Sequence, residues 1–329
     1  MRTLDFSLNI NNNINNNNNI NINNINNIKS IIGDNNQTVT WQCVMLCWGN
    51  KYSTTLIINL MTHIRQHSQK TAQFVLITDS IKPELSAINN VMQVLLPEYF
   101  NQNLFKAVGC QAKLAMFERG VLPTDLPAIY IDLDTVVLGD LSIALQYLDT
   151  PKTIALFQSA ILPFGKTGRI IARLSHKHYY ARGNSSIVVF QPSQCYYIAE
   201  QFKWHCQQYQ CLEQQQFVFK PLRADERFIS WIAQNTVRAL PNTFAVKFPT
   251  EFMFPFKPWL SVRAKLPWVI RRRQGLVAIT LNGLDIKPEK LQNLKNGDVI
   301  TDHKQRYLVW SNSVMGISKP KILAFYQNV

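Results

Sequence analysis

The 329-residue sequence predicts an α/β fold in which helices flank a largely parallel sheet. Short apolar segments that suit buried strands alternate along the chain with segments whose apolar residues recur at helical spacing. The intervals between the expected strands leave room for crossover connections, which place neighbouring strands parallel. The length and a hydrophobic fraction of 47% suit one large domain or two small ones with a substantial core.

The folded part is expected to begin near Thr38 and to follow a strand–helix–strand order. Expected strands cover residues 44–46, 74–78, 91–96 and 129–131, and expected helices cover residues 52–66 and 113–119. In the first helix, Leu56, Leu60 and Ile64 share one apolar face. Sheets of this kind bind ligands beyond the carboxyl ends of their strands, so the residues that follow each strand are candidates for the chemistry.

The two ends of the chain differ from the middle in composition. Residues 1–37 are rich in Asn, a low-complexity composition that predicts disorder. Residues 38–312 are expected to form a single main domain, and residues 313–329 a C-terminal tail. No segment approaches the roughly 18 uninterrupted apolar residues of a membrane span, and no signal peptide is visible, so a cytoplasmic location is expected. The six cysteines form no CxxC pair and are interpreted as reduced thiols.

Basic residues give the chain a formal net charge of +14, and many of them lie among aromatic residues in segment 248–274. No nucleic-acid-binding motif accompanies this charge, so no nucleic-acid partner is expected. Two interpretations of the segment stay open. It can be a surface that contacts anionic lipid on the inner face of the membrane or an anionic glycan acceptor. It can also be an irregular lid, packed on the sheet, whose arginines are solvated.

Two acidic residues follow the fourth expected strand. Asp132 and Asp134 are separated by one residue, so in an extended backbone their carboxylates point to the same side. Apolar runs flank them on both sides, and two like charges in such a place are costly without a cation. A hard divalent ion such as Mn²⁺ or Mg²⁺ would resolve the conflict and keep sites for phosphate oxygens. The alternative is a strand that ends in solvent with two hydrated acids.

The segment around these residues resembles the Asp-x-Asp strand of nucleotide-sugar glycosyltransferases with the GT-A fold, particularly the family 8-like bacterial group. The resemblance implies a Rossmann-like mixed, mostly parallel sheet flanked by helices. Upstream segments match the family in the same order and imply donor-binding roles for Trp48, Gly49, Asn50, Lys51, Tyr52, Asp79 and Lys113. Four of these residues have a simpler interpretation: Lys51 and Tyr52 can open a helix, Asp79 can cap a loop, and Lys113 can be a solvated helix residue.

Downstream segments extend the resemblance to about residue 310. The family pattern implies that Asn184, Ser185 and Ser186 face the donor, that Asp225 lies beside the anomeric centre, and that Gly283 and Lys287 contact the donor phosphates. A turn before a strand for residues 183–184 and a helix N-cap for Asp225 are the simpler alternatives. The family's metal-binding His is missing, and Asn282 or Thr280 is nearest its place. Asn is a poorer manganese ligand than imidazole, which puts metal affinity and activity in doubt.

The resemblance implies a metal-dependent, hexosyltransferase-like enzyme that moves a sugar from a nucleotide-sugar to an acceptor such as a cell-envelope glycan or a lipid-linked glycan. Asp132, Asp134 and Asn282 would hold the ion, Asn184 and Asp225 would orient the sugar, and Lys287 would stabilise the departing diphosphate. Two rival functions stay open: a non-catalytic nucleotide-sugar or glycan-binding protein, suggested by the missing His, and a nucleic-acid-binding protein, suggested by charge alone.

Overall fold

The computed structural model describes residues 38–107, 109–158, 162–281 and 286–326. The chain divides into two compact units, Met1–Asn35 and Asn36–Val329, and all the described residues belong to the second. The expected disorder of residues 1–37 therefore lies outside the described residues. So do Asn282 and Gly283, to which the family resemblance gives a metal-binding and a donor-binding role.

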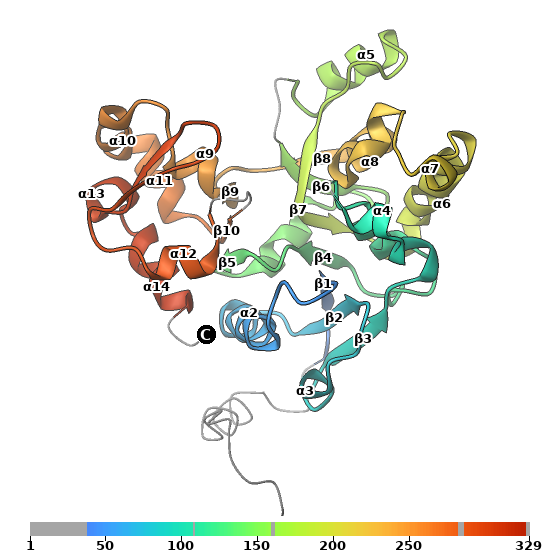
Figure 1. The fold of residues 1–329 in the computed structure, drawn as a ribbon, viewed down its shortest axis with the longest axis horizontal. Coiled ribbons are helices and arrows are strands. Elements are labelled where there is room, and N and C mark those ends of the chain that lie inside the picture. The colour runs from blue at the N-terminus through green and yellow to red at the C-terminus, as the bar shows by residue number, and fades with distance from the viewer. Residues whose placement is uncertain (1–37, 108, 159–161, 282–285, 327–329) are drawn as a thin grey trace, which may run out of the picture. The chain divides into compact units, whose positions relative to one another are not determined.

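A mixed sheet of seven strands forms the centre of the second unit, in the order β3-β2-β1-β4-β7-β6-β8 (Figure 1). The strands are β1 (Trp41–Cys47), β2 (Ala72–Thr78), β3 (Val91–Leu95), β4 (Ala128–Ile131), β6 (Ile154–Gln158), β7 (Gly183–Phe190) and β8 (Val237–Leu240). The first four are mutually parallel, whereas β7 runs antiparallel to both β4 and β6. The predicted fold class and the four predicted strands are therefore confirmed.

Each face of this sheet packs against its own hydrophobic core, because successive side chains of a strand point to opposite faces. In β1, Cys43 and Met45 belong to one core, and Val44 and Leu46 belong to the other. Helix α2 (Thr54–His67) packs in the first core. Helices η2 (a 3₁₀-helix, Gln111–Phe117), α6 (Pro192–Gln208) and α8 (Asp225–Ile232) pack in the second (Figure 1). The central strands β1, β4 and β7 are thus buried on both faces, which explains their continuous apolar runs.

A second, smaller sheet continues directly from the first. It contains β5 (Thr135–Val137), β10 (Ala278–Thr280) and β9 (Ala245–Lys247), in that order, with β10 antiparallel to β5 and parallel to β9. The chain passes from β4 to β5 through residues 132–134, where the amide of Thr135 donates to the carbonyl of Asp132 at 3.1 Å. The two acids therefore lie in a turn between two sheets, which corrects the prediction of an extended backbone at this point.

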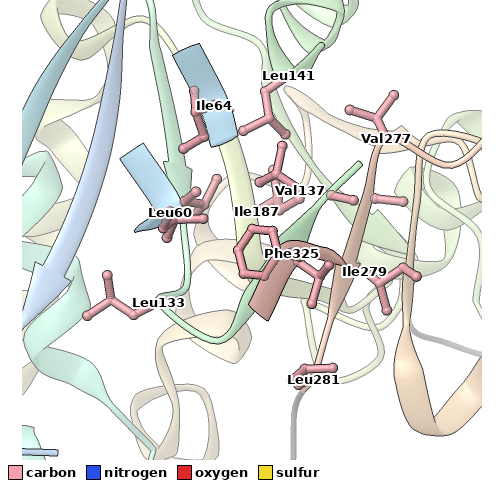
Figure 2. Close-up of a cluster of buried hydrophobic side chains, with 14 of the residues drawn as sticks. Leu60, Ile64, Leu133, Val137, Leu141, Ile187, Val277, Ile279, Leu281 and Phe325 are labelled. Atoms are coloured by element: carbon pink, nitrogen blue, oxygen red, sulfur yellow. The ribbon is translucent and has the colours of Figure 1, made fainter. Parts of the chain in front are cut away.

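The C-terminal part of the chain builds the helices that surround the second sheet (Figure 1). They are α9 (Phe248–Phe252), α10 (Lys257–Ala264), α11 (Pro267–Gln274), α12 (Pro288–Gln292), α13 (Asn312–Met315) and α14 (Ser318–Tyr326), with the hairpin β11 (Val299–Thr301) and β12 (Tyr307–Val309) among them. Residues 313–326, which were expected to be a tail, belong to the main domain instead. Asn59 donates to the carbonyl of Phe325 at 2.8 Å, and Figure 2 shows Phe325 in one core with Leu60, Ile64 and Val137.

The basic and aromatic segment 248–274 folds into α9, α10 and α11, so it is not an irregular lid. Its arginines are not uniformly solvated either. The buried carboxylate of Glu251 is paired with Arg273 at 2.7 Å, with Arg272 at 2.8 Å and with Arg263 at 3.5 Å. On the outside of α10 and α11 lie the exposed apolar side chains of Phe256, Trp259, Val262, Trp268 and Ile270. This segment therefore has a buried ionic side and an exposed aromatic side.

The remaining helices are short and connect the strands. They are α3 (Pro83–Ser86), α4 (Asn103–Lys106), α5 (Lys166–Leu174), α7 (Cys211–Gln214) and the 3₁₀-helices η1 (Glu98–Asn101), η3 (Leu141–Tyr147) and η4 (Lys220–Arg223). Across the described ranges, no helix has the length and apolar character needed to cross a bilayer. All six cysteines are free thiols, and five of them are buried.

Candidate functional site

The sheet topology brings together the carboxyl ends of β1, β2 and β4 and the beginning of β7. Strand β1 is flanked by β2 on one side and β4 on the other, which is the kind of switch point where open α/β sheets bind ligands. Because β7 is antiparallel to β4, the beginning of β7 lies beside the end of β4, with Ile131 paired to Ile187. The amide of Asp132 donates to the carbonyl of Ser186 at 2.9 Å. Residues 184–186 are therefore next to the predicted metal-binding acids.

Lys113 is the central cation of the site. Its ammonium lies 2.6 Å from Oδ1 of Asp132 and 3.8 Å from Oδ2 of Asp225. The hydroxyl of Tyr130 donates to the same Oδ1 of Asp132 at 2.8 Å. Burial lowers the pKa of Lys113, but Asp132 and Asp225 raise it, and the net pKa lies well above its ordinary value. Lys113 is thus a charged residue of the cluster, and the interpretation as a solvated helix residue is wrong.

Asp225 is the first residue of α8 and is buried against β7. The hydroxyl of Ser185 donates to its Oδ2 at 2.5 Å. Burial raises the pKa of Asp225 to about 6, although Lys113 and Ser185 act in the opposite direction. The residue that caps α8 is Ala224, without a side-chain hydrogen bond, so Asp225 is not the N-cap that the simpler interpretation expected. Its neighbour Glu226 accepts a hydrogen bond from Nδ2 of Asn184 at 2.6 Å.

Asp134 pairs with the other predicted cation. The ammonium of Lys287 lies 2.9 Å from Oδ2 of Asp134, and the side chains are 25% and 9% exposed respectively. Lys287 directly precedes α12, and the amide of Leu281 donates to the carbonyl of Asp134 at 3.0 Å. The turn between β4 and β5 therefore presents two carboxylates, and each of them is paired with a lysine from a distant part of the chain.

The loop after β1 closes another side of the site. The amide of Gly49 donates to Oδ2 of Asp79, at the end of β2, over 3.0 Å. Tyr52 is half-buried, and its pKa is raised by burial first and then by the charges of Asp134 and Asp132. The ammonium of Lys51 lies 5.2 Å from the centre of the Tyr52 ring.

The structure rejects one simpler interpretation of this loop and agrees with another. Helix α2 begins at Thr54 with Ser53 as its N-cap, so Lys51 and Tyr52 do not open it. Asp79 accepts the amide of Gly49 and so holds this loop, which agrees with its simpler interpretation as a loop cap. Trp48 packs against the hydrophobic core of α6 and α8, whereas Gly49 and Asn50 are exposed. The donor-binding roles of these residues stay predictions.

The described residues can hold a divalent cation at the turn. Oδ2 of Asp132 and Oδ1 of Asp134 have no partner among the described residues, so each carboxylate retains an oxygen for a metal ion. Within the described part of the chain, no three His, Cys, Asp or Glu side chains gather into a metal-binding group. Hard ions such as Mg²⁺ commonly bind to one or two carboxylates and complete their shell with water and substrate phosphates. The two carboxylates fit this pattern.

The structure brings together most of the residues that the sequence pointed to. Lys113, Asp132, Asp225 and Ser185 are joined by side-chain contacts. The pairs Asp134–Lys287 and Asn184–Glu226 are adjacent to this group along the chain, and the buried Ser186 adjoins it through its backbone. Sequence reasoning missed Tyr130, Glu226 and Lys247, the last residue of β9, whose pKa is lowered by burial and raised by the charges of Glu226 and Asp132. Tyr130 lies two residues before Asp132, and Glu226 adjoins Asp225, so a search of close neighbours for further polar side chains would have found both. Lys247 is not close in sequence to any predicted site residue, so a search of close neighbours would not have found it.

Comparisons with known proteins agree with this architecture. No protein-family model matches the chain, and no curated protein matches it in sequence. Among solved structures, the galactosyltransferase LgtC in complex with donor and acceptor sugar analogs is similar, with 12% identity over 88% of this chain and 96% of that chain and a TM-score of 0.52. An active-site mutant of LgtC is also similar, with 11% identity over 75% of this chain and 89% of that chain and a TM-score of 0.50. The chain therefore has the GT-A fold of nucleotide-sugar glycosyltransferases.

Proposed function

We propose that this protein transfers a sugar from a nucleotide-sugar donor to a glycan or lipid-linked acceptor. The observation that carries the proposal is the pair of ionic contacts at the β4–β5 turn, Asp132 with Lys113 and Asp134 with Lys287. The turn lies at the switch point of a GT-A sheet, where such folds bind nucleotides. The similar LgtC structure was solved with donor and acceptor sugar analogs, which supports the same class of ligands here.

The turn would bind the diphosphate of the donor. Asp132 and Asp134 would hold a Mn²⁺ or Mg²⁺ ion, which neutralises negative charge on the phosphates when it is bound. Lys287 is partly exposed beside Asp134, so its ammonium can also contact a phosphate oxygen. Charge stabilisation of the departing nucleoside diphosphate is then the main catalytic contribution of Lys287.

The residues on β7 and α8 would hold the sugar. Asn184 and Asp225 lie close to the turn and present an amide and a carboxyl group to a bound ligand. Asp225 carries a negative charge when the pH is above its pKa of about 6. That charge favours the positive charge that develops at the anomeric carbon as the bond to the diphosphate weakens. Lys113 fixes Asp132 relative to Asp225 and therefore acts as a positioning residue.

Nucleoside diphosphate release tests this proposal. Wild-type protein is incubated with a panel of nucleotide-sugars and Mn²⁺ or Mg²⁺, and Asp134→Ala and Lys287→Ala are compared with the control Lys70→Ala. Lys70 is exposed and precedes β2, at the opposite end of the sheet from the site. The wild type and the control should release product from at least one donor, and the two site variants should not. Equal release by Asp134→Ala would contradict the proposal.

One observation favours a second candidate function, the non-catalytic binding of a nucleotide-sugar. Lys113 and Lys287 already pair with the two carboxylates of the turn, so neither carboxylate is without a cationic partner when no ion is bound. A protein of this kind would bind a nucleotide-sugar with the same affinity in EDTA and would release no product. The release assay combined with a binding measurement distinguishes the two functions.

We also propose that the exposed side of α10 and α11 contacts an anionic membrane from the cytoplasm. Phe256, Trp259 and Trp268 are exposed there beside the exposed cations Lys257 and Arg271. Aromatic rings and cations on one surface suit the interface of a bilayer with anionic lipids. The protein should float with vesicles that contain phosphatidylserine and not with pure phosphatidylcholine vesicles. Trp259→Ser with Trp268→Ser should abolish flotation, and unchanged flotation would refute the contact.

A further inference from the structure

A cavity of about 680 Å³ lies between the two sheets, beside the proposed donor site. Its walls come from the ends of β6 and β8, from β9, and from helices α9, α10 and α11. The charged residues in the wall are Lys247, Glu251, Arg263 and Arg272. The volume is within the range of about 300–1,000 Å³ that is usual for small-molecule sites.

Strand pairing connects this cavity to the catalytic network. Phe157, in the cavity wall, pairs with Asn184 across β6 and β7. Lys247 pairs with Thr280, which pairs with Thr135, the residue after Asp134. Glu226 and Asp132 are the acidic groups whose charges act on Lys247. A ligand in the cavity would therefore lie next to the residues that we assign to the donor sugar.

The wall of the cavity carries an excess of positive charge. Glu251 is its one acidic side chain, and it is already paired with Arg263, Arg272 and the more deeply buried Arg273. The Nε of Arg272 is buried and has no hydrogen-bond partner among the described residues. Such orphaned donors are rare in folded proteins and call for a ligand, a water or an ion.

Lys247 is the clearest sign of a missing partner. Its ammonium forms no hydrogen bond or ion pair with any residue that the structure describes. Burial lowers its pKa, while Glu226 and Asp132 raise it by a smaller amount. A half-buried cation has lost part of its hydration, which is unfavourable, and contact with a bound anion would compensate for that loss. Lys247 and Arg272 thus line one cavity; Lys247 has no partner among the described residues, and Arg272, although paired with Glu251, has a buried Nε–H without an acceptor.

We infer that this cavity binds the acceptor, and that the acceptor carries an anionic group, a carboxylate or a phosphate ester, that pairs with Lys247 and Arg272. The inference rests on the proposed glycosyl transfer. In that reaction an acceptor hydroxyl oxygen bonds to the anomeric carbon, the bond from that carbon to the diphosphate breaks, and the hydroxyl proton passes to the departing diphosphate. The anionic group takes no part in these bond changes and fixes the acceptor in place.

Calorimetric binding of simple sugars tests the inference. The probes are glucose, glucuronic acid and glucose 6-phosphate, which share a ring and differ in charge and in the type of anion. The full-length protein is first saturated with Mn²⁺ and the nucleoside diphosphate of its donor, so that the phosphate site is filled. At least one anionic sugar should bind about tenfold more tightly than glucose, as expected for a charge-assisted contact. Tighter binding of glucuronic acid would identify the anionic group of the acceptor as a carboxylate, and tighter binding of glucose 6-phosphate would identify it as a phosphate.

Two variants assign the effect to the cavity. Lys247→Gln should abolish the preference for the anionic sugar, and its melting temperature should not fall, because the substitution removes an unpaired charge. Arg272→Gln should weaken the same preference, and the distant control Lys70→Gln should leave it unchanged. Equal binding of glucose and both anionic sugars, or a preserved preference in Lys247→Gln, would overturn the inference.

Donor binding separates this inference from the proposed function. If a nucleotide-sugar binds to wild type and Lys247→Gln alike but no anionic sugar is preferred, the inference alone fails. If no nucleotide-sugar binds to folded protein, the proposed function fails and the inference fails with it.

Discussion

The ammonium of Lys113 lies 2.6 Å from Oδ1 of Asp132, a contact that ties the 3₁₀-helix η2 to the turn at the end of β4. The same ammonium reaches Asp225 in α8 at 3.8 Å. One lysine therefore holds two acids from different parts of the chain in a single site. The positions of Asp132 and Asp225 depend on it, and the first prediction concerns its removal.

Replacement of Lys113 by Met should destabilise the protein. The side chains of Lys113, Asp132 and Asp225 are 13%, 17% and 7% exposed, so the substitution leaves two poorly solvated carboxylates without their cation. We expect a loss of about 3 kcal/mol in the free energy of unfolding. Urea unfolding at pH 7.5 measures it, with Lys70→Met as the exposed control. If Lys113→Met lowered the free energy of unfolding no more than Lys70→Met, the contacts of Lys113 with Asp132 and Asp225 would contribute little to stability.

The ionisation of Asp225 should appear in the pH dependence of stability. Its pKa is about 6 in the folded protein against 3.8 in the unfolded chain, so folding favours its protonated form. Its favourable contribution is complete below pH 3.8 and is lost as the pH rises through 6. Asp225→Asn cannot titrate. The free energy of unfolding of this variant, relative to wild type, should therefore rise by about 2–3 kcal/mol between pH 4 and pH 7.5. If the free energies of unfolding of wild type and Asp225→Asn, measured in EDTA, changed in parallel with pH, the pKa of Asp225 would not be raised.

Glu251 should be more important for stability than other ion-paired acids. Its side chain is 4% exposed and balances three arginines. Glu251→Gln leaves these cations unpaired, and we expect a loss of about 3–5 kcal/mol in the free energy of unfolding. The matched control is Asp149→Asn, because Asp149 pairs with Arg238 at an exposed site and should contribute about 1 kcal/mol or less. Thermal and urea unfolding of both variants provide the comparison, and similar losses would contradict the prediction.

Gly183 should tolerate no side chain. A Cβ at this position would lie 2.7 Å from Cδ1 and 2.9 Å from Cβ of Leu156, so β7 would have to shift away from β6. We expect Gly183→Ala to cost about 1–3 kcal/mol. Donor turnover should also fall, since Asn184 and Ser185 follow directly. Gly275→Ala is the control, because its Cβ would meet nothing closer than 3.5 Å. Unimpaired folding and turnover of Gly183→Ala would show that the strand adjusts.

The strands and the order of the motifs were predictable because each depends on local sequence. The buried strands are short apolar runs, and the residues that follow β1, β2 and β4 are the polar ones that a switch-point site requires. Asp132 and Asp134 could be named from this pattern, whereas Lys113 and Asp225 were named from the resemblance to GT-A glycosyltransferases. Their mutual contacts could not, because these depend on how η2 and α8 pack against the sheet.

Other features depend on long-range pairing and could not be foreseen. The run from Ile129 to Leu138 has the composition of one strand, yet the pairing of β5 with β10 divides it between two sheets at Leu133. Arg272 and Arg273 look solvated in sequence, and their partner Glu251 lies on a different helix. The C-terminal helices carry mixed polar and apolar residues, so their burial against α2 gave no local signal.

Donor affinity measured with and without a divalent ion is the most direct test of the central claim. Isothermal titration of wild-type protein with a panel of nucleotide-sugars, in Mn²⁺ and in EDTA, should identify one donor that binds more tightly with Mn²⁺. Asp134→Asn, with its folding verified by circular dichroism, should bind that donor equally weakly in both buffers. Ion-independent affinity of the wild type for every nucleotide-sugar, or an unchanged ion effect in Asp134→Asn, would contradict the assignment of this turn as a metal–diphosphate site.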